Sequence, residues 1–506
     1  MGDWFHRSAV VRPIQRIFGA QQRRGLRRGD SHSGRNTSRV HSMTPPQQAR
    51  IAAFETGLSK HGAHLGNTRV GLNRNGHGLG IFATRSLDKG DVVLEVPRDQ
   101  CIHAAIFDGP DVGETSFCLL DKATRAYGEW TDTLTATKAM QCAVARVAAQ
   151  LVQASFLGGT SGHSLYAALL PKPSIMHPLA SLWPGDLAAH EGILLLASFH
   201  RHMDEQWHSC MDMICDHLER GSIIEAGKDT LRWALFSVIS RAFVMNSKKG
   251  PVVTMVPYLD LSNHWTPTRQ DDRSCPCVFD ETANSALLVA QRTILHGQEM
   301  THSYCEASDS AMLCQYGIAP MAPGRNRFNR AQVCVPLEAV REDSVVEPLR
   351  PFGAWTNSAL LSARMHALQL HGWRDQSRPL TFTVPEDLGG RGPLLAVASL
   401  LAMDTLQDVE RWRVSPLQTS GKNLHPLVEG RAWRLIVGWL EEAHSSAVRA
   451  TEELVQQSGN SRNSAEATRI RLALTTAAAG EVLVLEEALS SAEQRATLCD
   501  VRAAGG

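Results

Sequence analysis

The chain of 506 residues contains eleven cysteines, yet no two of them have the CxxC spacing. A structural zinc site needs four ligands at short spacing, and a disulfide scaffold would be shorter and richer in cysteine. The only close pair, Cys275 and Cys277, meets neither requirement. We therefore expect free thiols in a reducing compartment and no metal site.

Long apolar runs and nucleotide-binding motifs are also missing. No run reaches the roughly 18 residues that cross a bilayer, and the longest candidates, GILLLASF and LLAVASLLAM, have the length of core helices. The chain contains no GxxxxGK[ST], HExxH or GxSxG motif. The glycines of GHGLG at 76–80 do not form GxGxxG, because Ile81 occupies the position of the last glycine. We expect neither a membrane partner nor a dinucleotide site.

Acidic residues are scarce in the first 50 residues, which hold ten arginines, two aspartates and neither lysine nor glutamate. This composition is typical of an organellar transit peptide for a plastid or mitochondrion. It is also that of a disordered basic tail, which would leave a cytoplasmic or nuclear location open. We exclude residues 1–48 from the fold. Because basic and acidic residues are equal in number over the whole chain, the remainder is net acidic, and we expect no nucleic-acid partner.

Candidate strands fall in two blocks. IFATRSL and DVVLEVP flank a DKG turn within residues 71–100, and VVTMVPYLDL begins a second block at 252–304. Between the blocks, at about 110–235, alanine, leucine and methionine recur at helical spacing. From about residue 330 the pattern is again mostly helical. The sequence predicts an α+β fold whose strand region is split by a helical insert and followed by a helical domain.

The second block raises a question at its PYLDLSNHW segment, where an apolar run ends in Asn263 and His264. Asparagine and serine favour turns, so the segment could be a simple turn with a histidine in the core. Two polar side chains at the end of a buried strand could also belong to a binding site. The residues taken singly leave both interpretations open.

Four segments taken in order resemble one family. GLGIFATRSLDKGDVVLEVP at 78–97 is similar to the opening of a SET domain. SRAF at 240–243, YLDLSNHW at 258–265 and ILHGQEMTHSYCEASDSAMLCQYGI at 294–318 resemble its catalytic half. The helical insert, which contains HSLYAALLPKPSIMHPLASLWPGDLAAHEG, and the C-terminal helices resemble the Rubisco large-subunit lysine methyltransferase class.

This resemblance implies a SET-type β-fold with a knot-like loop at the cofactor. It implies a SET domain at 49–328 with the helical insert at about 110–235. A helical, substrate-binding-like domain would follow at 329–492, and residues 493–506 would form a tail.

The resemblance also implies S-adenosylmethionine as the cofactor. Asn263 and His264 would hold its adenosyl part, and Arg241 would meet its carboxylate, which a guanidinium group suits. Tyr304 would be the catalytic residue at the methyl-transfer channel and would also contact the substrate. The main chain at Arg241 and Asp260 would contribute to substrate binding. The other cofactor-binding residues that the resemblance implies are His77, Gly78, Leu79 and Tyr316.

The implied activity is protein-lysine N-methylation of a non-histone protein. The class also contains an actin-histidine methyltransferase, and QDDRSCPC at 270–277 resembles that member. However, Ala242 and Phe243 follow Arg241, which is the lysine-type arrangement. We therefore expect lysine as the acceptor, with histidine as an alternative.

Three departures from the family pattern favour another alternative, a catalytically inactive SET-fold protein that binds a partner. Ser310, Ala311, Met312 and Leu313 stand where Asn-Ala-Glu-Leu is usual. Ile318 replaces a phenylalanine, and Cys305 stands where glycine or aspartate is common. These departures would change how side chains pack on the cofactor side of the expected site. The target protein, the number of methyl groups and the oligomeric state stay open.

Overall fold

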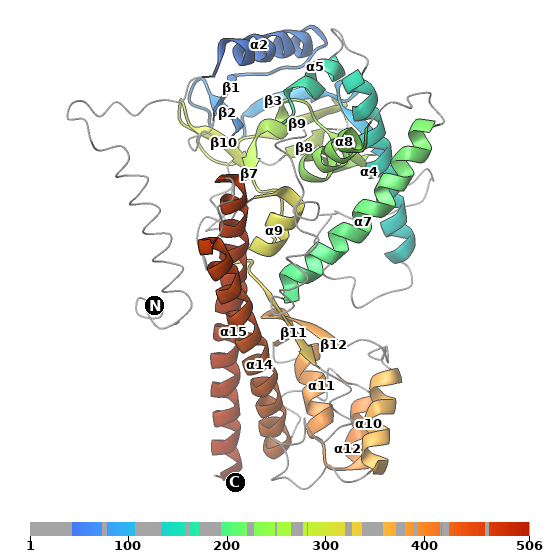
Figure 1. The fold of residues 1–506 in the computed structure, drawn as a ribbon, viewed down its shortest axis with the longest axis vertical. Coiled ribbons are helices and arrows are strands. Elements are labelled where there is room, and N and C mark those ends of the chain that lie inside the picture. The colour runs from blue at the N-terminus through green and yellow to red at the C-terminus, as the bar shows by residue number, and fades with distance from the viewer. Residues whose placement is uncertain are drawn as a thin grey trace, which may run out of the picture.

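In the computed structural model, a part rich in small sheets sits at one end of two long helices, α14 (Pro426–Asn460) and α15 (Ala465–Ala504) (Figure 1). Shorter helices pack beside the other end of this pair. The residues described are 43–72, 78–106, 133–156, 162–171, 194–219, 227–247, 250–264, 277–280, 282–318, 326–335, 358–370, 380–388, 392–414, 416, 425–460 and 465–504.

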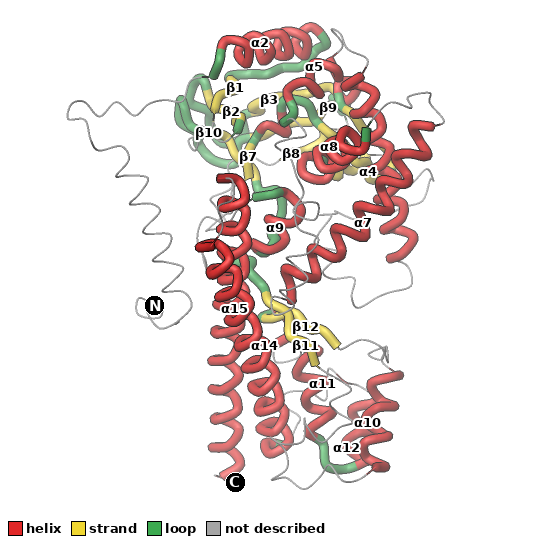
Figure 2. Tube along the Cα trace, viewed as in Figure 1, coloured by secondary structure: helices red, strands yellow, loops and turns green. Residues whose placement is uncertain are grey.

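Small sheets form the first part of the molecule (Figure 2). Its strands are β1 (Thr68–Leu72), β2 (Leu79–Ala83), β3 (Val92–Pro97), β4 (Ile102–Ala105), β5 (Phe243–Ser247), β6 (Gly250–Met255), β7 (Asn263–His264), β8 (Cys277–Asp280), β9 (Ser285–Val289) and β10 (Glu299–His302). They form sheets of order β1-β2-β10-β7, β3-β9-β8 and β4-β6-β5. Among the described strands of this part, β10 and β7 pair in parallel and the other pairs are antiparallel.

Each of these sheets joins the two sequence blocks. Strand β2 of the first block pairs with β10 of the second, with Ile81 opposite Met300, and both side chains are fully buried. In the same way β3 pairs with β9, and β4 with β6. The predicted α+β fold, with two separated β segments that meet in space, is confirmed.

Helices surround these sheets. They are α2 (Pro45–Lys60), α4 (Thr133–Phe156), α5 (Gly162–Leu169), α7 (Leu194–Glu219), α8 (Lys228–Arg241) and α9 (Asp309–Tyr316). Helix α4 packs on β4 and β6. Its residues Val144, Ala148 and Leu151 recur at helical spacing and are buried. Helix α8 ends at Arg241, two residues before the start of β5 at Phe243.

The C-terminal region is mostly helical, as the sequence predicts. Its elements are the antiparallel strands β11 (Ala331–Val335) and β12 (Leu380–Val384), and the helices α10 (Ser358–Leu370), α11 (Pro393–Ala402), α12 (Leu406–Val414), α14 and α15. Its core includes Trp412 and Trp433, which are fully buried. Helix α15 continues through much of the expected tail at 493–506 as far as Ala504, because Ala496 and Cys499 pack into that core.

Among the described residues, no helix combines the length and the apolar character needed to cross a membrane. Within the same part of the chain, no three His, Cys, Asp or Glu side chains are grouped so that they could hold a metal ion. The cysteines whose side chains are described are free thiols.

A buried carboxyl group on α15 joins three parts of the molecule. Glu481 accepts a hydrogen bond from the Ser310 hydroxyl on α9 at 2.5 Å and from the Leu196 N–H at the start of α7 at 3.0 Å. A Cβ on the adjacent Gly480 would lie 2.8 Å from Asn329 Nδ2, so glycine allows this close approach. Burial raises the pKa of Glu481 to about 8. The long helix is therefore docked on α9 and α7 through a titratable group.

We expect Glu481→Gln to remove a pH dependence of stability. The pKa of Glu481 is about 8 in the folded chain, against 4.5 for an unburied glutamate. Between these values the unfolded state releases a proton that the folded state keeps, so stability falls as pH rises. The free energy of unfolding of the unmodified chain should fall relative to that of the variant by roughly 1 kcal/mol per pH unit in this window.

Chemical denaturation at several values between pH 5 and 8.5 measures this difference. Glu487→Gln is the matched control, since Glu487 is exposed on the same helix. Parallel stability profiles for the unmodified chain and Glu481→Gln would contradict the assignment.

Candidate functional site

The Asn-His pair of the PYLDLSNHW segment forms a short strand and not a turn. After β6 the chain reverses at Tyr258, whose φ of 71° is unusual for a large side chain. The Tyr258 hydroxyl is held by Thr68 at 3.0 Å and by Glu55 at 3.2 Å. The chain then passes through the 3-10 turn η4 (Leu259–Leu261) and enters β7 beside β10. The polar pair is thus built into a sheet.

Asn263 connects this strand to the first β block. Its Nδ2 donates to the carbonyl of Leu79 at 3.1 Å and to Glu299 Oε1 at 2.6 Å. A Cβ on Gly80 would lie 2.5 Å from Glu299 Oε1, so the approach depends on glycine. A Cβ on Gly78 would have nothing within 4 Å among the residues that the structure describes. His77, the remaining residue expected here, lies outside the described residues.

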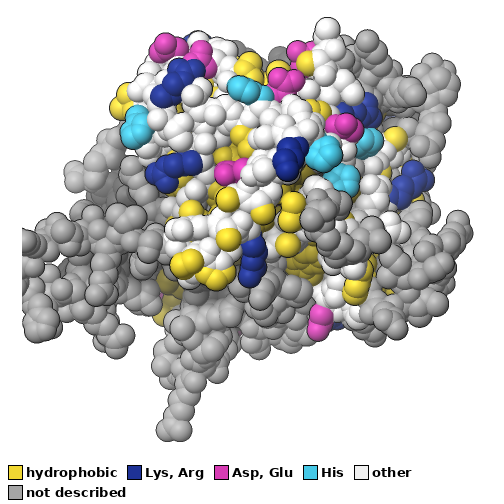
Figure 3. All heavy atoms as spheres, turned by 90° about the horizontal axis from the view of Figure 1, so that it is seen from above, with side chains coloured by type: hydrophobic (Ala, Val, Ile, Leu, Met, Phe, Trp, Pro, Cys, Tyr) yellow, Lys and Arg dark blue, Asp and Glu magenta, His cyan; other side chains and the backbone are white. Residues whose placement is uncertain are grey.

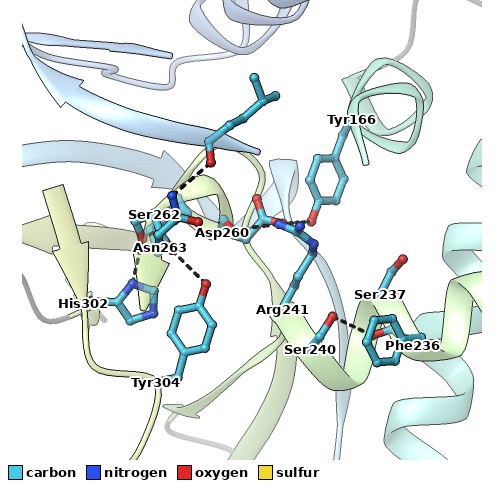
Figure 4. A network of polar contacts seen from close by, with 12 residues as sticks. Tyr166, Phe236, Ser237, Ser240, Arg241, Asp260, Ser262, Asn263, His302 and Tyr304 are labelled. Carbon is cyan, nitrogen blue, oxygen red and sulfur yellow. Dashed lines mark hydrogen bonds and ion pairs between the residues drawn. The ribbon is translucent and has the colours of Figure 1, made fainter. Parts of the chain in front are cut away.

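Tyr304, two residues after β10, lies against β7 (Figure 4). Its hydroxyl donates to the carbonyl of Ser262 at 3.0 Å. Its ring centre lies 5.1 Å from that of Tyr316 and 4.7 Å from that of His302. Burial raises the pKa of Tyr304 to about 12, so the phenol keeps its proton at neutral pH. The side chain is therefore a hydroxyl and not a phenolate.

His264 is a neutral imidazole at neutral pH, because burial lowers its pKa to about 4. Its Nδ1 accepts a hydrogen bond from the backbone N–H of Tyr304 at 3.1 Å. A neutral ring with an acceptor at Nδ1 carries its proton on Nε2. The ring centres of His264 and Tyr304 lie 5.2 Å apart.

Arg241, Asp260 and Tyr166 form a buried polar network beside these residues (Figure 4). Arg241 Nη1 donates to the carbonyl of Asp260 at 3.1 Å and lies 3.6 Å from Asp260 Oδ2. The Tyr166 hydroxyl, on α5 of the insert, donates to the same Oδ2 at 2.7 Å. Burial raises the pKa of Asp260, whereas Arg241 and the hydrogen bond from Tyr166 lower it. Asp260 Oδ1 and Arg241 Nε are buried without a hydrogen-bond partner among the described residues.

Most of the candidate residues come together in one place. The described ones that bond or pack within this site are Leu79, Arg241, Asp260, Asn263, His264, Tyr304 and Tyr316. The sequence did not single out Ser262, Glu299 or His302, and it gave Tyr166 only as part of the insert segment HSLYAALLPKPSIMHPLASLWPGDLAAHEG. Each of them contacts a candidate residue far away in the chain, so no local pattern marks them.

Comparison with known proteins gives matches in structure alone. No protein-family model matches the chain, and no curated protein matches it in sequence. The SET domain of LSMT bound to lysine and AdoHcy matches with a TM-score of 0.59 and 15% identity, over 90% of this chain and 93% of that one. Rubisco LSMT bound to AdoMet matches with a TM-score of 0.57 and 15% identity, over 90% and 94% of the two chains.

The chain has the SET-domain fold of Rubisco LSMT. A third structure, Rubisco LSMT bound to sinefungin and monomethyllysine, matches with a TM-score of 0.56 at 15% identity, over 90% of this chain and 94% of that one. Because the matches extend over nine-tenths of the chain, they include the insert and the C-terminal helices as well as the sheets.

The three departures from the SET-family pattern have packing partners here. The Cys305 Sγ lies 3.6 Å from the sulfur of Met312, so two of the unusual residues contact each other. Ser310 donates to the buried Glu481. Ile318 packs in the same apolar cluster as Tyr304. Each departure named here is therefore accommodated by a contact in the folded chain.

The outer face of the SET part carries mixed charge. Seen from its end of the molecule, basic, acidic and histidine side chains alternate with apolar ones over the described surface (Figure 3). No region of one sign covers the part of this face that the structure describes.

We expect Tyr166→Phe to destabilise the fold by about 1–3 kcal/mol, because Asp260 Oδ2 loses a buried donor. The pKa of Asp260 is already raised in the folded chain and would rise further in the variant. Asp260 in the unfolded state then releases its proton at a lower pH than Asp260 in the folded state. The stability lost in the variant should therefore grow as pH rises between the pKa of Asp260 in the folded unmodified chain and its higher pKa in the folded variant.

Denaturation at pH 5 and pH 8 measures both effects. In an Asp260→Asn background, Tyr166→Phe should cost less than half as much, because no carboxylate remains to be stabilised. An equal cost in both backgrounds would show that the hydroxyl does not act on Asp260.

Proposed function

We propose that this chain is an S-adenosylmethionine-dependent methyltransferase that acts on a lysine side chain of a non-histone protein. One observation carries the proposal. Arg241, Asn263, His264 and Tyr304, from three separate segments of the chain, meet at one largely buried polar site. They do so within a fold whose structural neighbours were solved with AdoMet, AdoHcy and lysine.

The residues of the site fit the cofactor. Arg241 Nε is a buried cationic donor without a hydrogen-bond partner among the described residues, and a bound carboxylate would satisfy it. No described residue would crowd a Cβ on Gly78, so this part of the structure leaves room for a ligand against the main chain. A neutral His264 beside Asn263 can contact an uncharged adenosine without a charge penalty. The residues that would hold the cofactor are Gly78, Leu79, Arg241, Asn263, His264 and Tyr316, together with His77, which the family resemblance implies.

When bound, S-adenosylmethionine would supply an electrophilic methyl group on a sulfonium centre. The chain's own task is to orient an uncharged amine, whose pKa is about 10.4 in free lysine. A buried site beside a positive charge disfavours the ammonium form. The Tyr304 hydroxyl donates to Ser262, so its oxygen is left to accept an N–H of the amine and to direct the nitrogen lone pair. The carbonyls of Arg241 and Asp260 would accept further contacts.

Lysine is favoured over histidine because of the residue after Arg241. Ala242 has no side-chain group that could accept or donate a hydrogen bond to an imidazole. Phe243, which follows, packs against His302 with ring centres 5.4 Å apart. If the basic arm is a transit peptide, the target would be an organellar protein.

Titration calorimetry with S-adenosylmethionine tests the cofactor site. We expect binding by the unmodified chain and an affinity at least about tenfold lower in Arg241→Met and Asn263→Ala, since each loses a hydrogen-bonding group. Arg232→Met is the matched control, because Arg232 is exposed on the same helix as Arg241. An inactive scaffold would bind no cofactor.

Removal of the Tyr304 hydroxyl tests the catalytic role. We expect Tyr304→Phe to lower the rate of methyl transfer by about 100-fold while cofactor affinity stays within about twofold. The assay is transfer from tritiated S-adenosylmethionine to proteins of organellar and cytosolic extracts, followed by amino-acid analysis. Methylhistidine in place of methyllysine would overturn the acceptor assignment, and an unchanged rate would overturn the role of Tyr304.

A further inference from the structure

His302 is a buried histidine beside Tyr304 that the proposed chemistry does not use. It is the last residue of β10 and has only 6% of its surface exposed. Its ring lies 4.7 Å from that of Tyr304 and 5.4 Å from that of Phe243. Its Nδ1 lies 2.7 Å from the Ser262 hydroxyl oxygen (Figure 4).

The direction of this hydrogen bond follows from the proton available on Ser262. The Ser262 hydroxyl lies 2.7 Å from the Leu259 carbonyl, which can only accept. The single hydroxyl proton therefore points to Leu259, and the bond to His302 must use a proton on the ring. His302 thus carries its proton on Nδ1 and donates to Ser262.

Ser262 is in turn the residue that holds the Tyr304 hydroxyl. Its side chain is fixed between His302 and Leu259, and its backbone N–H also donates to the Leu259 carbonyl at 3.0 Å. Its own carbonyl accepts the hydroxyl of Tyr304 at 3.0 Å. One imidazole ring therefore contacts the phenol directly and also orients the group to which the phenol is anchored.

We propose that His302 is a positioning residue for Tyr304: its ring packs against the phenol, and its Nδ1–H fixes Ser262, whose carbonyl anchors the Tyr304 hydroxyl. This inference rests on the proposed methyl transfer. The inference adds His302 to that mechanism as a residue that does not contact the reacting atoms.

The charge state of His302 agrees with positioning and not with proton transfer. Burial and the neighbouring His264 lower its pKa to about 3, so the ring stays neutral at any pH at which the enzyme would work. A base with such a pKa would be too weak to take a proton from an ammonium group. Its hydrogen bond to Ser262 is correspondingly unchanged over the working range of pH.

A purely space-filling role makes a different prediction. Burial of a polar imidazole costs free energy unless it is hydrogen-bonded, so leucine would fill the same space as well or better. Leucine would lack the donor to Ser262. Substitution by leucine therefore separates the two roles.

The decisive experiment is a double-mutant cycle of His302→Leu and Tyr304→Phe. The assay is transfer from tritiated S-adenosylmethionine to the extract fraction that the unmodified chain labels. With Tyr304 present, we expect His302→Leu to lower kcat about tenfold, the size of effect expected when one anchoring hydrogen bond is lost. In the Tyr304→Phe background it should lower kcat less than about twofold, because the hydroxyl to be positioned is already gone.

Two amide substitutions give a rescue test. In His302→Asn the side-chain amide nitrogen can occupy nearly the position of Nδ1, whereas in His302→Gln it extends to that of Nε2. We expect His302→Asn to retain several times more activity than His302→Gln or His302→Leu. Cofactor affinity should stay within about twofold in all three, and thermal unfolding would verify that each is folded at the assay temperature.

The outcomes are distinguishable. Equal losses from His302→Leu in both backgrounds, or equal activity of the Asn and Leu variants, would overturn the positioning role while leaving the proposed function intact. A lack of methyl transfer by the unmodified chain would overturn the proposed function and the positioning role with it.

Discussion

The site depends on the parallel pairing of β7 with β10 and on the side chain of Asn263 that crosses from it to β2. Strand β7 has only two residues, so its backbone pairing alone is a weak attachment. Asn263 adds hydrogen bonds to the Leu79 carbonyl and to Glu299, and Gly80 leaves the room for them. This contact joins residues 184 positions apart and brings the two β blocks to one point.

The polar groups gathered there are mostly uncharged, which suits a buried site. The two histidines are neutral because burial lowers their pKa values, and Tyr304 keeps its proton. The site also contains the guanidinium group of Arg241 and the carboxyl groups of Asp260 and Glu299; Arg241 lies against Asp260, which accepts the hydroxyl of Tyr166. A cation with a spare donor beside neutral hydrogen-bonding groups is an environment suited to a ligand that carries both a carboxylate and an uncharged ring.

Helices outside the SET sheets also reach the site. Tyr166 connects the helical insert to Asp260, and Glu481 connects the long C-terminal helix to α9, which follows Tyr304 in the chain. Asp309 at the start of α9 is held by Asn326 and Asn329, which precede β11. The insert and the C-terminal region therefore help to hold the segment around Tyr304 in position.

The sequence alone determined the two β blocks, the helical insert and the helical C-terminal region, because strand and helix periodicities are local properties of the chain. It also pointed to Arg241, Asn263, His264 and Tyr304, since these lie in segments that, in their order along the chain, resemble one family. Only the tertiary structure decided that Tyr166 binds Asp260 across 94 positions and that His302 binds Ser262 across 40. Such contacts depend on where the folded chain places side chains from separate elements, and no spacing within a single segment encodes that.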